Sequence, residues 1–223
     1  MGVRRRRQAA RLGVLLRPER ELWRQGWRYV AGVDEVGVGP LAGPVVAAAV
    51  VFASDVRIAG VDDSKRLTAA TRERLADEIR RRALAIGIGM VTVDEVDRLN
   101  VYRAALEAMR RAVVALHVPI DHLLVDARTI PGVDVPQLPI IKGDARSFSI
   151  AAASIIAKVT RDAQMVELAL EFPQYGFAEH MGYGTLAHLD ALRRYGPCPA
   201  HRRSFAPIRQ PALPGFGAGE PGA

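Results

Sequence analysis

The sequence predicts an α/β protein built on one mixed β-sheet with helices on its faces. Apolar strands come first in hairpin-like succession and then alternate with amphipathic helical segments, which is the pattern of a mixed sheet covered by helices. Hydrophobic residues make up 49% of the 223 residues, enough to bury the core of one domain. The chain shows no internal repeat and no interdomain linker, so a single domain is expected.

The first half of the chain begins with two strands and a helix. Residues 28–36 predict a strand, and a glycine-rich turn separates it from a second strand at 45–52. The second strand is almost entirely small and β-branched, which suits burial on both faces. A polar loop at 62–67 follows, and Thr68 is placed to cap a charged helix that ends near Arg82.

The later elements alternate between strands and helices. A helix at 100–117 is stopped by Pro119, and the helix at 147–172 carries a face of small residues that permits close packing. The other expected elements are a strand at 85–93, a short turn or helix at 94–98, strands at 122–126 and 138–142, loops at 131–136 and 173–184, and a helix at 185–195.

The basic charge belongs to the N-terminal extension, residues 1–27. The chain carries a net charge of +7, and residues 1–28 alone contain nine Arg and two Glu. The remainder is therefore neutral as a whole. Two interpretations stay open for this leader: a solvated tail, or an arm that steers nucleic acid, since clustered arginines are attracted to phosphate backbones.

The end of the chain, residues 208–223, predicts a flexible tail rich in Pro and Gly. Gln210, Leu213 and Phe216 have the spacing of a sliding-clamp peptide, which suggests a weak clamp contact. Pro211 and Pro214 favour a plain flexible tail instead.

Composition excludes several classes of protein. No apolar run has transmembrane length, and the N-terminus lacks a secretory signal. The single cysteine, Cys198, predicts a reducing cytoplasm. Five histidines without paired spacing disfavour a zinc hydrolase. With 6% aromatic residues, no sugar cleft is indicated for a glycosidase. Nothing demands more than a monomer.

Four acidic residues stand at the ends of three predicted strands. Asp34 and Glu35 lie near the end of the first strand, Asp126 closes the apolar run "HLLVDA", and Asp144 follows "LPIIKGD". Taken singly, the pair is explained by a solvated strand end, and Asp144 by capping the long helix. Together they predict one cluster, because a mixed sheet brings such strand ends together.

Convergent carboxylates are typical of sites for hard divalent cations, which prefer oxygen ligands. Two Mg²⁺ or Mn²⁺ ions held in this way activate water and stabilise the leaving oxygen of a phosphodiester. The sequence therefore indicates metal-dependent cleavage of nucleic acid.

Six ordered blocks, spanning about residues 29–207, resemble bacterial ribonuclease HII. They are "AGVDEVGVGPLAGPVVAAAVVF" (31–52), "DDSKRLT" (62–68), "LLVDA" (123–127), "IIKGDARSFSIAAASIIAKVTRD" (140–162), "FPQYGFAEHMGYGT" (172–185) and "GPCPAHRRSF" (196–205). The resemblance implies a catalytic domain over 28–207 with an RNase H-like mixed sheet and a C-terminal helical region. It implies hydrolysis of RNA–DNA hybrids and cleavage 5′ of ribonucleotides embedded in DNA, leaving 3′-hydroxyl and 5′-phosphate ends.

The resemblance also assigns roles to residues. The metal-binding and catalytic acids correspond to Asp34, Glu35, Asp126 and Asp144. A turn that reads the ribose 2′-hydroxyl corresponds to Gly37, Val38 and Gly39, and a tyrosine that packs on the neighbouring sugar to Tyr183. Lys65 and Arg146 resemble phosphate or active-site contacts, with solvated surface residues as the plain alternative. Lys142 and Lys158 flank the site segments and are candidates to brace the carboxylates.

Two departures from the family pattern delete cations. Val38 stands where the family has Arg, and Met181 where it has Lys. We expect the catalytic activity to be retained and the binding of nucleic acid to be weaker. Each lost phosphate contact also reduces the slope of log affinity against log salt concentration. Two alternatives follow: a hybrid-binding protein with impaired catalysis, and another nuclease of this fold such as a junction resolvase. Intact acids count against the first, and the "GPLAGPV" and "GYGT" blocks against the second.

Overall fold

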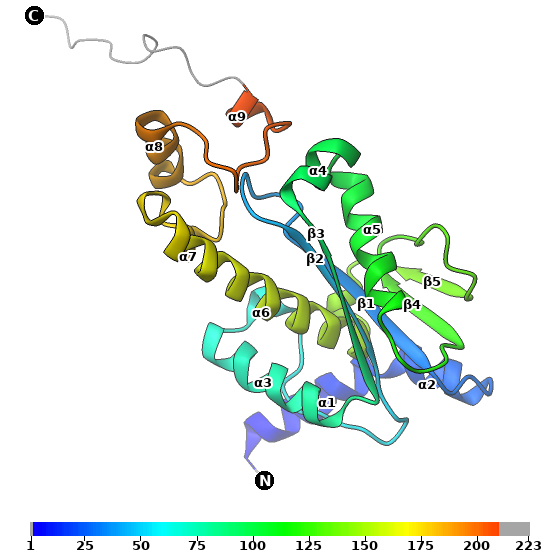
Figure 1. The fold of residues 1–223 in the computed structure, drawn as a ribbon. Helices are drawn as coiled ribbons and strands as arrows, with labels where there is room; N and C mark the ends of the chain where they lie inside the picture. The colour runs from blue at the N-terminus through cyan, green and yellow to red at the C-terminus, as the bar shows by residue number, and fades with distance from the viewer. Residues whose placement is uncertain (1, 210–223) are drawn as a thin grey trace, which may run out of the picture.

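The computed structural model describes residues 2–209 and contains one five-stranded mixed sheet in the order β3-β2-β1-β4-β5 (Figure 1). β1 pairs antiparallel with β2, and β2 pairs antiparallel with β3. β4 runs parallel to both β1 and β5. The strands are β1 (Val30–Val36), β2 (Val45–Val51), β3 (Ala85–Val91), β4 (His122–Asp126) and β5 (Gln137–Ile140). The predicted α/β class with a mixed sheet is confirmed.

Helices cover both faces of the sheet. α5 packs on one face, while α3 and the long α6 cover the other (Figure 1). The helices are α1 (Val3–Leu15), α2 (Arg17–Arg24), α3 (Ala69–Arg82), α4 (Val93–Leu99), α5 (Val101–Val114), α6 (Phe148–Glu171), α7 (Phe177–His180), α8 (Leu186–Tyr195) and α9 (Ala206–Arg209). Three 3₁₀ turns accompany them: η1 (Ser64–Arg66), η2 (Gly143–Ala145) and η3 (Pro173–Tyr175).

β2 is buried along its whole length, as its composition predicts. Its side chains alternate between the two faces, so Ala47 and Ala49 meet α5, whereas Ala48 and Val50 meet the α6 side. Beside it, Gly32 of β1 lies directly under the backbone of Ser149, where a Cβ would collide. This close approach brings the start of α6 down onto the strand that carries Asp34 and Glu35.

The leader is folded, so a free solvated tail is the wrong description of residues 3–24. Leu15, Leu16 and Leu22 are buried against the body of the protein. Glu19 is buried as well, and its carboxylate accepts hydrogen bonds from both the hydroxyl and the N–H of Ser149. The leader therefore docks on the N-terminal end of α6.

Several boundaries differ from the prediction. β5 ends at Ile140 instead of 142, because Lys142 adopts a left-handed conformation that ends the strand. The expected loop at 173–184 contains η3 and α7, and the chain stays ordered through α9. No helix within residues 2–209 is long and apolar enough to cross a membrane.

Candidate active site

The site lies where β1 and β4 stop pairing. The parallel ladder ends at the pair Val33 and Val125, so Asp34 and Asp126 are the next residues on the two strands. Parallel strands present their carboxyl ends at the same edge of a sheet, and this edge is a favoured place for a ligand site. The sheet itself therefore brings these acids together.

Three of the four predicted acids converge. One carboxylate oxygen from each of Asp34, Glu35 and Asp126 lies within 4.8 Å of the others, a geometry that can hold a metal ion. Asp34 accepts a hydrogen bond from the Glu35 N–H at 2.9 Å, and Asp126 accepts one from the Gly143 N–H at 2.6 Å. The second contact ties β4 to the segment that carries Asp144.

Asp144 occupies the rim of this cluster. It lies in η2 and does not open the long helix, because Ser147 is the residue that caps α6. The capping explanation of Asp144 is thus wrong. The residue is only 8% exposed, and its Oδ2 lies 3.8 Å from the Lys65 ammonium nitrogen. Together with burial, the charge of Asp144 raises the pKa of Asp34, although Asp144 is outside the group of three acids.

The cluster is strongly perturbed electrostatically. Burial raises the pKa of Asp34 well above its usual range, and the neighbouring charges of Glu35 and Asp126 raise it further. The pKa of Glu35 is raised as well, chiefly by burial, although the Arg128 guanidinium opposes this. Burial likewise raises the pKa of Asp144. Holding these acids close together and buried therefore costs free energy, and a bound cation would reduce that cost.

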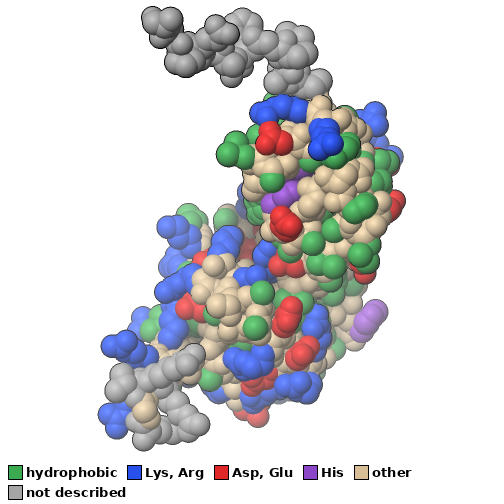
Figure 2. Space-filling model, turned by 90° about the vertical axis from the view of Figure 1, so that its left-hand side faces the viewer, with side chains coloured by type: hydrophobic (Ala, Val, Ile, Leu, Met, Phe, Trp, Pro, Cys, Tyr) green, Lys and Arg blue, Asp and Glu red, His purple; other side chains and the backbone are tan. Residues whose placement is uncertain are grey.

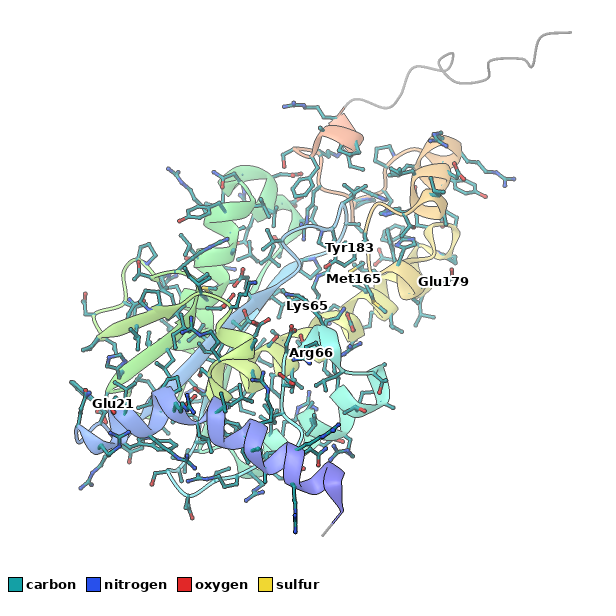
Figure 3. All side chains as sticks on the ribbon, turned by 180° about the vertical axis from the view of Figure 1, so that it is seen from behind. Glu21, Lys65, Arg66, Met165, Glu179 and Tyr183 are labelled. Carbon is teal, nitrogen blue, oxygen red and sulfur yellow. The ribbon has the colours of Figure 1, made fainter. Side chains whose placement is uncertain are left out.

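The opposite effect acts on Lys65, at the mouth of the site. Burial would lower its pKa, but the charges of Asp144 and Asp34 outweigh burial, and the pKa is raised. Lys65 is thus held as a cation beside the acids. In Figure 3, Lys65, Met165 and Tyr183 follow one another from the loop before α3 toward the C-terminal helices.

The predicted substrate contacts lie in two groups. Gly39 is exposed, and a Cβ built on it would lie 3.7 Å from the Tyr183 ring, so the turn and Tyr183 share one surface. Tyr183 is 46% exposed, which argues against a core packing role. Arg146 is also exposed and donates to the Ile141 carbonyl at 3.3 Å. Contact between Arg146 and the acids is not observed within residues 2–209.

The other two lysines do not brace the carboxylates. Lys158 forms an ion pair with Asp162 at 2.6 Å, and Lys142 is exposed at the end of β5. Only Lys65, of the three lysines, lies against a site acid.

Sequence reasoning missed several supporting side chains. The Ser154 hydroxyl of α6 lowers the pKa of Asp34, against the effect of burial, and shares a hydrogen bond of 2.9 Å with the Ser64 hydroxyl, which links the helix to the loop of Lys65. Arg11 of α1 joins Asp62 at 2.5 Å and the Ala145 carbonyl at 3.0 Å. Ser154 belongs to the small-residue face of α6, but no local pattern marks Arg11.

Comparisons with known proteins agree with this geometry. The family model for ribonuclease HII matches residues 31–208. A ribonuclease HII from Geobacillus kaustophilus (strain HTA426) is 59% identical over 196 residues, which cover 88% of this chain and 75% of the relative. One from Myxococcus xanthus (strain DK1622) is 57% identical over 206 residues, covering 92% of this chain and 70% of the relative.

Solved structures show the same fold. The ribonuclease H2 of Pyrococcus horikoshii OT3 superposes with a TM-score of 0.69 at 28% identity, over 81% of this chain and 95% of that one. A ribonuclease HII of Archaeoglobus fulgidus, solved in complex with PCNA, gives 0.65 at 27% identity, over 78% and 93%. The fold, the acidic cluster and the sequence matches agree: the chain belongs to the ribonuclease HII family of metal-dependent endonucleases.

Proposed function

We propose that this endonuclease hydrolyses the RNA strand of RNA–DNA hybrids and cuts on the 5′ side of ribonucleotides embedded in duplex DNA. The products are 3′-hydroxyl and 5′-phosphate ends. The observation that carries the proposal is the group of three carboxylates within 4.8 Å, with Asp144 and Lys65 at its rim. Such a site suits phosphodiester hydrolysis assisted by divalent cations.

The residues present fit a divalent metal. Glu35 has one buried carboxylate oxygen without a hydrogen-bond partner within residues 2–209, and burial together with mutual repulsion raises the pKa of Asp34. Carboxylate oxygens are the ligands that Mg²⁺ and Mn²⁺ prefer. Asp34, Glu35, Asp126 and Asp144 would hold two such ions, which supply a nucleophilic water and stabilise charge on the leaving oxygen.

The chain's own residues orient the substrate. The N–H groups of the turn at Gly37, Val38 and Gly39 address the 2′-hydroxyl, the one group that separates RNA from DNA at a given position. Tyr183, next to Gly39, packs on the neighbouring sugar. Lys65 contacts the phosphate near the acids, and Arg146 binds the backbone farther out.

Surface charge supports a nucleic-acid substrate. On the face shown in Figure 2, Lys and Arg side chains gather over the part of the molecule where α1 and α3 lie. Arg6 and Arg7 of the leader are exposed. Exposed cations of this kind attract phosphate backbones and make binding sensitive to salt. We assign the leader a steering role on this basis.

One assay tests the proposed function. The full chain is incubated with Mn²⁺ or Mg²⁺ and a duplex DNA that carries a single ribonucleotide. Cleavage at its 5′ side, abolished by excess chelator, is the expected result. Binding without cleavage would support the hybrid-binding alternative. Activity that persists in chelator would overturn the metal-dependent mechanism.

A clamp contact is a separate proposal. The motif of Gln210, Leu213 and Phe216 lies outside the described residues. The solved complex of an archaeal ribonuclease HII with PCNA motivates the test. A pull-down with the cognate sliding clamp should recover the full chain and lose it when Phe216 is changed to Ala. No recovery of the full chain would end this proposal.

A further inference from the structure

The loop that joins β1 to β2, called here the turn segment (residues 37–44), is held from below by a buried arginine. Arg202 follows α8 in the "AHRRSF" block and is fully buried. Its guanidinium donates hydrogen bonds of 2.6–3.2 Å to five carbonyl groups of the turn segment, those of Gly37, Val38, Pro40, Gly43 and Pro44. One side chain thus fixes most of the loop.

A second buried arginine acts beside the first. Arg161 of α6 donates to the carbonyls of Pro44, Ala42 and Met181 at 3.0–3.1 Å. Within residues 2–209, neither guanidinium has a carboxylate within salt-bridge distance. Burial, and then the charge of Arg161, lower the pKa of Arg202 to about 9. Backbone carbonyls therefore accept the hydrogen bonds that these two charged groups donate, which makes the carbonyl contacts costly to lose.

The direction of the carbonyls decides the direction of the N–H groups. All peptide bonds in residues 2–209 are trans, so each N–H points opposite to the preceding carbonyl. The carbonyls of Gly37 and Val38 point at Arg202, so the N–H groups of Val38 and Gly39 point away from it. No hydrogen bond within the described chain uses either N–H. Successive free N–H groups of this kind make a concavity for an oxygen ligand.

We propose that Arg202 is a positioning residue for ribose recognition: it holds the turn segment so that the Val38 and Gly39 N–H groups face the substrate. The inference rests on the proposed function of this turn. Gly37 allows the arrangement, because it has a φ of 93° and a Cβ there would lie 2.7 Å from the Pro44 carbonyl oxygen. Val38 serves here through its backbone, so the missing arginine side chain leaves this part of recognition intact.

A lysine cannot replace Arg202 in this role. The guanidinium spreads five donors over a planar fork, whereas an ammonium has three donors at one point. Arg202→Lys therefore keeps a cationic side chain but leaves several turn carbonyls unpaired. A displacement of about 1 Å at a positioning group can reduce the rate about hundredfold. We expect kcat/KM on a duplex with one ribonucleotide to fall by about that factor.

The test compares two readouts on the full chain. The first is kcat/KM on the single-ribonucleotide duplex, and the second is the inhibition constant of an all-DNA duplex of the same sequence. Arg202→Lys should reduce the first and leave the second within about twofold, because the phosphate-binding surface is untouched. Arg203→Lys, an exposed neighbour with the same change of chemistry, should alter neither. Because an unfolded fraction would lower kcat/KM without changing the inhibition constant, each rate is normalised to the concentration of folded protein measured by circular dichroism.

The outcomes separate this inference from the function on which it rests. If the wild-type chain does not cleave the ribonucleotide duplex, the proposed function fails. If it does, and folded Arg202→Lys keeps its kcat/KM, the positioning role is overturned even when the variant melts at a lower temperature.

A measurement on the wild type covers the case in which Arg202→Lys does not fold. Backbone ¹⁵N relaxation should give Val38 and Gly39 order parameters near about 0.85, typical of rigid backbone. Values below about 0.6 would show a mobile turn and would overturn the inference.

Discussion

The acidic cluster lies next to the turn segment, which two buried arginines contact. The acids and the arginines differ in the partners that stabilise their charges. Asp34, Glu35 and Asp126 form no ion pair within residues 2–209, and burial, with mutual repulsion, raises the pKa of Asp34. Over the same described residues, the Arg161 and Arg202 guanidiniums also have no carboxylate within salt-bridge distance, but they donate hydrogen bonds to backbone carbonyls. A buried charge without a partner marks a place for an external ion, whereas a buried charge that is hydrogen-bonded to the backbone marks a structural support.

The largest expected effect comes from breaking the acidic side of this comparison. Asp34→Asn should reduce hydrolysis by about 10²–10³-fold or more, as when one preorganised electrostatic group is removed. The same change should raise the melting temperature of the metal-free protein, because it removes repulsion with Glu35 and Asp126. Calorimetry and cleavage rates measure both effects, and Asp134→Asn, in an exposed loop, is the control. A lower melting temperature would contradict the account.

Glu19 sharpens the comparison, because it is a buried acid outside the site whose Oε1 has three donors, while its Oε2 has no partner within residues 2–209. Its carboxylate accepts bonds from Ser147 and Ser149. Glu19→Ala should lower the free energy of unfolding by about 2–4 kcal/mol, since these donors lose their acceptor. The control is Glu21→Ala on the same helix, whose exposed pair with Arg24 should matter by less than about 1 kcal/mol. Denaturant titration measures the free energy of unfolding of both variants. Equal effects of Glu19→Ala and Glu21→Ala would show that the hydrogen bonds of Glu19 do not contribute more than an exposed ion pair.

Beside the buried Arg202, protonation of His201 should lower the free energy of unfolding. Burial and the neighbouring His188 lower the pKa of His201 to about 4, so the folded protein keeps it neutral. Between about pH 6.5 and pH 4 the unfolded chain binds a proton that the folded chain does not. This contribution is present above pH 6.5 and is lost as the pH falls, by roughly 3 kcal/mol in total.

The measurement is unfolding free energy against pH for matched histidine variants. His201→Gln should flatten the acid loss of stability, whereas His117→Gln, an exposed position, should leave it as in the wild type. An unchanged slope in His201→Gln would show that another group is responsible.

The smallest expected effect concerns the surface of the turn. Val38→Arg adds the cation that the family pattern carries at this position. The slope of log affinity against log salt should steepen by about 0.9 for one added phosphate contact. Val38→Gln supplies a neutral side chain as the control. Unchanged affinity and slope in Val38→Arg would place position 38 away from the nucleic-acid backbone.

Much of the sheet and the site could be predicted because the signals are local. The unbroken apolar composition of residues 45–51 marks a strand covered on both sides, and the structure confirms it. Asp126 ends its strand as expected, and it meets Asp34 because parallel neighbours share an edge. The place of Asp144 was harder, since its segment forms a 3₁₀ turn before the helix cap at Ser147.

The sequence by itself determined the mixed sheet, the acids at its strand ends and the resemblance to ribonuclease HII. Only the tertiary structure decided that the leader docks on α6 and that Arg202 holds a turn 158–165 residues earlier in the chain. The physical reason is that these contacts end on backbone carbonyl and N–H groups. Every residue type carries a carbonyl, so no pattern of side chains records which ones an arginine will reach.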